Sequence, residues 1–130
     1  MNKQTHVPAW ETLGSTARAA QIWGHHQLVS NILSRAAAEA RRSLGPLDIS
    51  YARFLIELAD IYTSGQRHDR AEECLREAIE IYKEHFGDDH PSVGLLMHEL
   101  AECLQDKGEN EEAAKCNETS RSILRLLKAS

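Results

Sequence analysis

Histidines and cysteines are the residues of this chain whose side chains could hold a metal ion. The sequence contains seven histidines and three cysteines among 130 residues. His25 and His26 are adjacent and therefore point to different faces of a helix, while His85 and His90 flank a turn that contains glycine. The spacings HxxxH, HExxH and CxxC, which bring two ligands to one ion, are absent from the sequence. We expect no metal site and no bound cofactor.

The cysteines do not indicate catalysis either. Cys74, Cys103 and Cys116 are scattered along the chain, and any disulfide scheme leaves one of them unpaired, so reduced thiols in a cytoplasm are the simplest interpretation. Cys74 and Cys116 fall on apolar stripes, where cysteine behaves as a small hydrophobic residue. The sequence contains no nucleophile elbow, no phosphate-binding loop and no glycine-rich dinucleotide turn. We therefore expect a cytoplasmic protein that is not an enzyme.

Composition and charge exclude two further classes of function. The apolar fraction is 42%, yet no apolar run approaches the roughly 18 residues of a membrane span, and the first residues do not resemble a signal peptide. The formal net charge is −5, and an acidic surface repels the phosphates of nucleic acids. The charge is uneven, because residues 1–46 hold five basic and two acidic residues, whereas residues 47–130 hold ten basic and eighteen acidic ones. We expect neither nucleic-acid nor membrane binding.

A repeat of forty-two residues organises the whole chain. The stretch "FLIELADIY" at 54–62 returns as "LMHELAECL" at 96–104, and Ala71 with Cys74 returns as Ala113 with Cys116. The step predicts three units, at about 5–46, 47–88 and 89–130, of which the first is the most degenerate. Together they form a single predicted domain over residues 1–130.

Each unit is predicted to contain two antiparallel helices, because apolar residues recur at three- and four-residue spacings on either side of a polar break. In the middle unit, Gly65 is expected to take a left-handed conformation and Asp69 to cap the next helix. In the third, Pro91 suits a first helical turn, with Asp88 and Asp89 as capping carboxylates. The six predicted helices cover residues 8–23, 26–44, 48–64, 69–86, 91–107 and 110–128.

The apolar stripes also predict the core. Small residues at fixed places in the units, such as Ala59 and Ala101, allow one helix to approach another closely. The residues expected in the core are Leu55, Leu58, Ala59, Tyr62, Ala71, Leu75, Ala78, Leu100, Ala101 and Leu104.

The repeat resembles one known family more than the HEAT and armadillo alternatives. Leu58-Ala59 followed by Tyr62, and then Ala71, Leu75 and Ala78, resembles the tetratricopeptide pattern of small and large residues. The longer unit, closing with "HFGDDHPSV", is similar to the kinesin-light-chain type of that repeat. The resemblance implies an all-α superhelix whose first helices line a concave groove. It also implies a scaffold that binds a peptide or protein partner, without chemistry of its own.

The family's groove positions can be carried over to this chain. They fall on Arg18, Arg53, Glu57, Asp60, His98, Glu99, Glu102 and Asp106. Kinesin-light-chain-type repeats usually place paired asparagines where this chain has Ile56-Glu57 and His98-Glu99, so the usual grip on a peptide backbone is missing. The acidic residues instead predict a preference for basic peptides. The alternative is that these charged residues only form the solvent-exposed polar faces of amphipathic helices and bind nothing.

The terminal helices offer a second interpretation, in which the partner is another copy of the chain. The last helix gathers apolar residues over 123–127, and the first unit carries large aromatic residues outside the best-conforming repeat positions. Opposite charges on the two ends of the chain favour end-to-end docking. The residues predicted to carry this homo-oligomeric contact are Trp10, Trp23, Ile123, Leu124 and Leu127.

Overall fold

The structure is a computed structural model, and it describes the backbone of residues 9–22 and 25–129 and the side chains of 9–16 and 25–126. Within these residues the chain forms six α-helices and no strand. The helices are α1 (Ala9–Ile22), α2 (His26–Leu44), α3 (Ile49–Ser64), α4 (His68–Phe86), α5 (Pro91–Asp106) and α6 (Asn110–Ala129). Each end lies within one residue of the predicted position, so the all-α prediction is confirmed.

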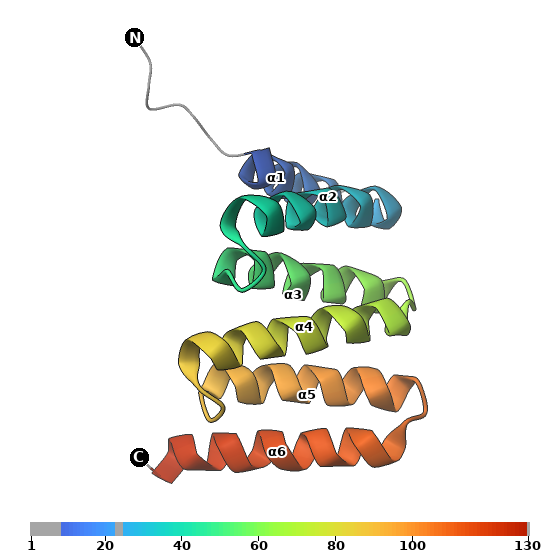
Figure 1. The fold of residues 1–130 in the computed structure, drawn as a ribbon. Helices are drawn as coiled ribbons and strands as arrows, with labels where there is room; N and C mark the ends of the chain where they lie inside the picture. The colour runs from blue at the N-terminus through green and yellow to red at the C-terminus, as the bar shows by residue number, and fades with distance from the viewer. Residues whose placement is uncertain (1–8, 23–24, 130) are drawn as a thin grey trace.

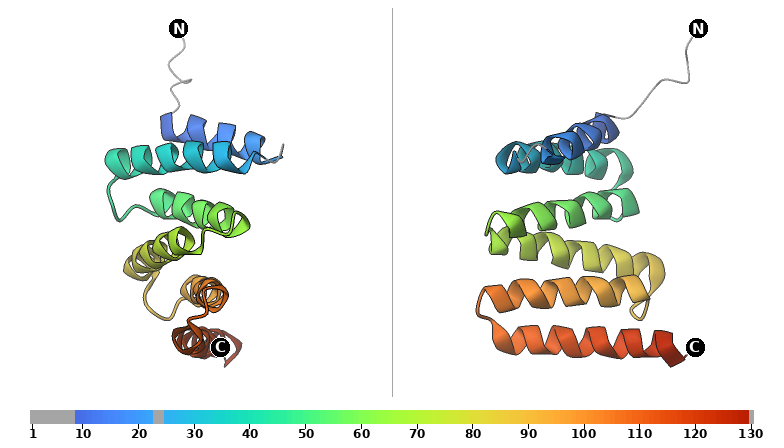
Figure 2. Two further views of the ribbon diagram at one scale, coloured as in Figure 1. Left: turned by 90° about the vertical axis from the view of Figure 1, so that its right-hand side faces the viewer. Right: turned by 180° about the vertical axis from the view of Figure 1, so that it is seen from behind.

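The helices stack in chain order, each packed against the next and running antiparallel to it (Figure 1). Seen from the side, successive helix pairs are rotated about the stacking direction, which makes the array a superhelix (Figure 2). The forty-two-residue step is visible in the helix limits, because α4 begins and ends forty-two residues after α2, and α5 forty-two residues after α3.

The turns between units combine a glycine with a side-chain cap. Gly45 and Gly87 follow α2 and α4 with φ angles of 103° and 91°, a conformation that other residues rarely adopt. The next helix then begins at a cap: Asp48 accepts a hydrogen bond at 2.7 Å, and the Nδ1 atom of His90 accepts one at 3.1 Å, each from the backbone N–H two residues on. The starts of α3 and α5 are therefore each fixed by residues of the turn that precedes them.

Three predictions about the residues that end or cap the helices are wrong. The left-handed residue after α3 is Gln66, with a φ of 63°, and not Gly65, whose φ is −91°. Asp69 lies within the first turn of α4 and forms an ion pair with Lys107 rather than a cap. The cap of α5 is His90, so the carboxylates of Asp88 and Asp89 do not serve as caps.

The core runs through the array between the stacked helices. All ten predicted core residues are buried, which confirms that prediction. Contact between α5 and α6 is especially close at Gly94, where a Cβ atom would lie 3.0 Å from Cγ2 of Ile123. The hydroxyl of Ser120 donates a hydrogen bond of 2.8 Å to the Gly94 carbonyl oxygen. Small residues at such positions set the spacing of the helices.

Candidate partner-binding groove

Two hollows flank α3. The first, which we call the acidic pocket, lies between α3 and α5 and has a volume of about 310 Å³. The second, which we call the apolar pocket, lies between α1 and α3 and has a volume of about 680 Å³. The acidic pocket is lined by Ala59, Asp60, Thr63, Leu75, Glu99, Glu102, Cys103, Gln105 and Asp106. The apolar pocket is lined by Trp10, Glu11, Ser50, Arg53, Phe54, Ile56, Glu57 and Tyr82.

The acidic pocket gathers four of the predicted groove residues. Glu99, Glu102 and Asp106 follow one another on α5 at spacings of three and four residues, so they share one face of that helix. Asp60, on the last turns of α3, reaches the same hollow from the other side. Packing α3 against α4 and α4 against α5 therefore assembles carboxylates from two helices that do not adjoin in the chain.

Among the residues that the structure describes, no lysine or arginine compensates these carboxylates. Burial raises the pKa of Asp60. Burial also raises the pKa of Glu99, and the negative charges of Asp60 and Glu102 raise it further, while His98 partly opposes the shift. Within the described residues, none of the acidic side chains of the pocket pairs with a lysine or arginine; Glu102 lies 3.7 Å from the His98 ring. The pocket thus holds a half-buried Glu99 among the exposed carboxylates of Asp60, Glu102 and Asp106, and like charges at this distance repel one another.

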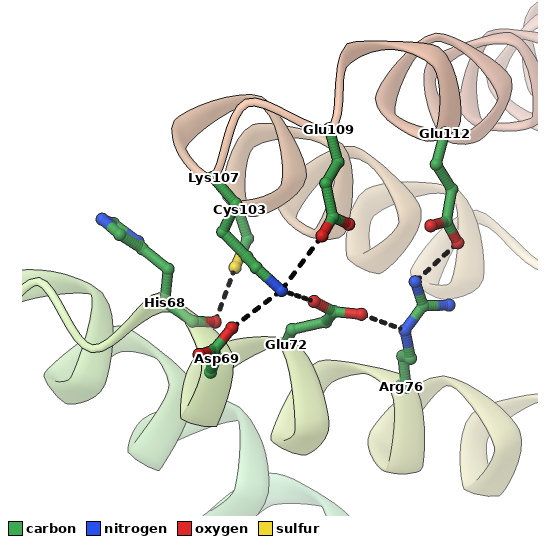
Figure 3. A network of polar contacts seen from close by, with 8 residues as sticks. All are labelled: His68, Asp69, Glu72, Arg76, Cys103, Lys107, Glu109 and Glu112. Atoms are coloured by element: carbon green, nitrogen blue, oxygen red, sulfur yellow. Dashed lines mark hydrogen bonds and ion pairs between the residues drawn. The ribbon is translucent and has the colours of Figure 1, made fainter.

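Carboxylates at another place in the fold are paired with cations. Figure 3 shows this for the contact of α4 with the turn between α5 and α6. The ammonium of Lys107 lies 2.8 Å from Asp69 and 2.6 Å from Glu72. Arg76 bonds Glu72 at 2.7 Å and Glu112 of α6 at 2.6 Å. Hydrogen bonds from Lys107 are the main cause of the lowered pKa of both Asp69 and Glu72. This network joins helices, whereas the described part of the chain gives the acidic pocket no lysine or arginine partner.

The apolar pocket receives other predicted residues. Arg53 and Glu57 line it together with aromatic side chains. The ring of Trp10 meets that of Phe54 edge to face, with centroids 5.8 Å apart and an interplanar angle of 83°. Arg53 is exposed and makes no ion pair within the described part of the chain. Glu57 and Asp60 thus lie in different hollows, although they are three residues apart on one helix.

The remaining predicted groove residues lie apart from both hollows or outside the described side chains. His98 is exposed, and its Nδ1 atom lies 3.3 Å from the Asn117 side-chain oxygen on α6. The side chain of Arg18 lies outside the described residues.

Three of the residues predicted for end-helix association, Trp10, Ile123 and Leu124, have described side chains, and these do not gather on one exposed surface. Ile123 is only 3% exposed because it packs against Gly94, so it is not available to a partner. Trp10 belongs to the apolar pocket, and Leu124 is half-buried. Trp23 and the side chain of Leu127 lie outside the described residues. Leu126, in the same stretch of α6, is 55% exposed.

Several residues near the predicted groove were missed by sequence reasoning. Phe54 and Tyr82 are not among the predicted groove residues, yet both line the apolar pocket. Leu95 is 56% exposed on α5 and lies forty-two residues after Arg53. The repeat step alone could have identified Leu95, because it gives equivalent positions on successive first helices.

The comparisons with known proteins agree with the fold. The model of the tetratricopeptide repeat family matches residues 50–125, more than half of the chain. Two solved structures of TPR-like repeats from a kinesin-light-chain-like protein of Podospora anserina, one a point variant, are 26% and 27% identical. Each superposes with a TM-score of 0.80 over 96% of this chain and 59% of the other. BtubC of P. vanneervenii has a TM-score of 0.63 over 93% of this chain and 65% of its own, at 13% identity, and shows the fold alone.

Two curated relatives also match. The RxLR effector protein SFI4 of Phytophthora infestans is 31% identical over 93 residues, which cover 67% of this chain and 27% of that protein. The secreted RxLR effector protein RXLR-C07 of Plasmopara halstedii is 30% identical over 71 residues, which cover 55% of this chain and 22% of that protein. The chain therefore spans about a quarter of the length of these relatives. Among its described residues, no helix is long and apolar enough to cross a membrane.

Proposed function

This chain belongs to the tetratricopeptide repeat family, with repeats of the kinesin-light-chain type, and from that premise we propose that it binds a basic peptide segment of a protein partner. The fold is that of a protein–protein interaction module, and scaffolds of this kind are typically non-enzymatic. In this proposal the chain acts by binding and not by catalysis. Residues 1–130 form one domain, with units at about 5–46, 47–88 and 89–130.

The uncompensated charge of the acidic pocket carries the proposal. Glu99 is half-buried, and its burial and the nearby charge of the more exposed Asp60 both raise its pKa. A lysine or arginine side chain entering the hollow supplies the cation that the described residues do not. Asp69 and Glu72 already have such a cation in Lys107, so we assign their cluster a structural role. The acidic pocket is without a described lysine or arginine, and we assign it a binding role.

The same charge disfavours acidic ligands. A peptide with acidic side chains, or with a free C-terminal carboxylate placed in this pocket, meets like charge without a compensating donor. The proposal therefore specifies the sign of the partner's charge.

Direct binding measurements test the proposal. Fluorescence anisotropy with labelled lysine-rich and glutamate-rich peptides, at two salt concentrations, should show tighter binding of the basic peptide and weakening by salt. The double variant Asp60→Asn, Glu99→Gln should lose the preference. Glu73→Gln, which removes an exposed charge on α4, is the matched control and should retain it. Equal or tighter binding of the acidic peptide would refute the assignment.

A second candidate function is homo-oligomerisation through the terminal helices. It is favoured by the exposed Leu126 on α6 and by the opposite net charges of residues 1–46 and 47–130. Sedimentation equilibrium of the wild type beside Leu126→Lys tests it. A wild type that dimerises and a variant that does not support this candidate, whereas two monomers at high micromolar concentration exclude it.

We further propose a reducing cytoplasm as the site of action. Burial is the main cause of the raised pKa of all three free thiols, and it takes that of Cys74 to about 12, so the cysteines are packing residues in their protonated form. One relative carries the word "secreted" in its name, which makes location a question for experiment. Thiol labelling of the protein in intact cells should find all three cysteines reduced, and a mixed disulfide would contradict this location.

A further inference from the structure

The two pockets divide one face of the array into regions of different chemistry. Arg53, in the apolar pocket, and Asp60, in the acidic pocket, lie on the same helix seven residues apart. At 1.5 Å per residue, the two side chains leave α3 about 10 Å apart along its axis. A peptide long enough to cross both pockets therefore meets apolar surface at one side and negative charge at the other.

The walls of the apolar pocket suit a large apolar side chain. Trp10 and Tyr82 are each only partly buried, so their rings still offer apolar surface to the hollow. Ile56 and the edge-to-face pair of Trp10 with Phe54 complete the apolar part of the lining. Its volume of about 680 Å³ leaves room for a leucine or an aromatic side chain.

Charge separates the two pockets in degree. The apolar pocket is lined by charges of both signs, the exposed guanidinium of Arg53 and the carboxylates of Glu11 and Glu57. The lining of the acidic pocket has four carboxylates and, among the described residues, no lysine or arginine. The basic part of a ligand therefore gains more from the acidic pocket than from the apolar pocket.

We propose that the apolar pocket anchors a large apolar side chain of the same peptide whose basic residues enter the acidic pocket. This inference rests on the proposed function and adds the second half of the recognition motif. In an extended peptide, which rises about 3.3 Å per residue, a span of about 10 Å corresponds to about three residues. The preferred ligand has one leucine or aromatic residue about three positions from a lysine or arginine pair.

Short synthetic peptides can test the motif. The probes are a seven-residue peptide with the order Ser-Leu-Ser-Ser-Lys-Lys-Ser, its reversed sequence, and the same two peptides with serine in place of leucine. Burial of a leucine side chain should tighten binding by about tenfold or more for one of the two orders. The background variant Trp23→Phe leaves Trp10 as the single tryptophan, and its emission should shift to shorter wavelength only with a leucine probe.

Variants of the apolar pocket test whether the advantage of the leucine peptides arises there. Trp10→Ala should remove the advantage of leucine over serine while the serine peptide binds as before. Because Trp10 also packs on Phe54, Ile56→Ala is a second variant with a smaller disturbance, and thermal unfolding reports whether each remains folded. Leu28→Ala, which shortens an exposed leucine on α2, is the matched control and should leave the advantage intact.

The outcomes separate this inference from the proposed function. If leucine and serine probes bind the wild type equally and both depend on Asp60 and Glu99, the apolar anchor is wrong and the basic-peptide function stands. If no basic probe binds, the proposed function fails and this inference fails with it. A leucine advantage that disappears in Trp10→Ala or Ile56→Ala, and persists in Leu28→Ala, supports the anchor.

Discussion

Ile79 and Arg121 occupy the same position in successive repeats, yet the first is buried and the second faces water. Ile79, on α4, is 3% exposed, and Ala37, the equivalent residue on α2, is 5% exposed. The Arg121 side chain, on α6, is 65% exposed and pairs with Glu118 at 3.4 Å. The outer face of α6 is therefore polar where the preceding second helices are apolar, as an end surface of a helical array must be if it meets solvent.

Exchanging the two residue types at this position should lower stability strongly in α4 and leave it almost unchanged in α6. Ile79→Arg places an unpaired charge in the core and should cost more than about 3 kcal/mol of unfolding free energy. Arg121→Ile alters an exposed site and should change stability by less than about 0.5 kcal/mol. Urea denaturation of both variants measures these values, and comparable losses would show that α6 is covered in solution.

Close helix contacts predict a second effect on stability. Ala59 and Ala101 are 2% and 0% exposed, so replacing either with leucine forces packed helices apart. We expect each change to cost about 1–3 kcal/mol. Ala114→Leu, at an exposed position of α6, is the control and should be almost neutral. Unchanged thermal midpoints in Ala59→Leu and Ala101→Leu would mean that the core can expand at these positions.

The Lys107 network predicts how stability depends on pH. Hydrogen bonds from Lys107 lower the pKa of Asp69 and Glu72 in the folded state. A carboxylate with a lowered folded-state pKa stabilises the fold above its unfolded pKa of about 4, and this contribution is lost as pH falls through the folded value. Lys107→Met should therefore be less stable than the wild type at neutral pH. The difference should shrink below about pH 4, which denaturation at several pH values can follow.

Much of the fold is predictable because its causes are local or periodic. Spacings of three and four residues predicted every described helix, and the forty-two-residue step predicted the buried residues on successive units. The end of α3 was predicted less well because Gln66, which is not a usual left-handed residue, takes the positive φ. Asp69 was misread as a cap because its partner, Lys107, lies in the turn after α5, far away in the sequence.

The site was predictable in part. The family's groove positions, carried over to this chain, included Asp60, Glu99, Glu102 and Asp106, and the structure brings these four to one hollow. Spacing along α3 could not show that Glu57 faces a different hollow, because that depends on how α1 and α5 pack on either side of this helix. The unpaired state of the acidic pocket is likewise a property of distances between helices.

The raised pKa values of Asp60 and Glu99 predict that peptide binding is sensitive to mild acid. A cation binds the ionised carboxylates, so affinity for a basic peptide should fall as pH drops through their folded-state pKa values. Those values lie above the ordinary carboxyl pKa of about 4, mainly because of burial. Loss of binding should therefore begin at a higher pH than for a site made of exposed carboxylates.

Proton release gives an independent measurement of the same effect. Near the raised pKa values, a bound lysine or arginine stabilises the charged form and expels protons from the pocket. Calorimetric titration in two buffers with different ionisation enthalpies should detect this release in the wild type. Glu99→Gln removes one of the two raised groups, so it should bind more weakly at neutral pH and release fewer protons on acidification. Binding that stays constant between neutral pH and the ordinary carboxyl pKa would mean that the basic side chains are held elsewhere on the array.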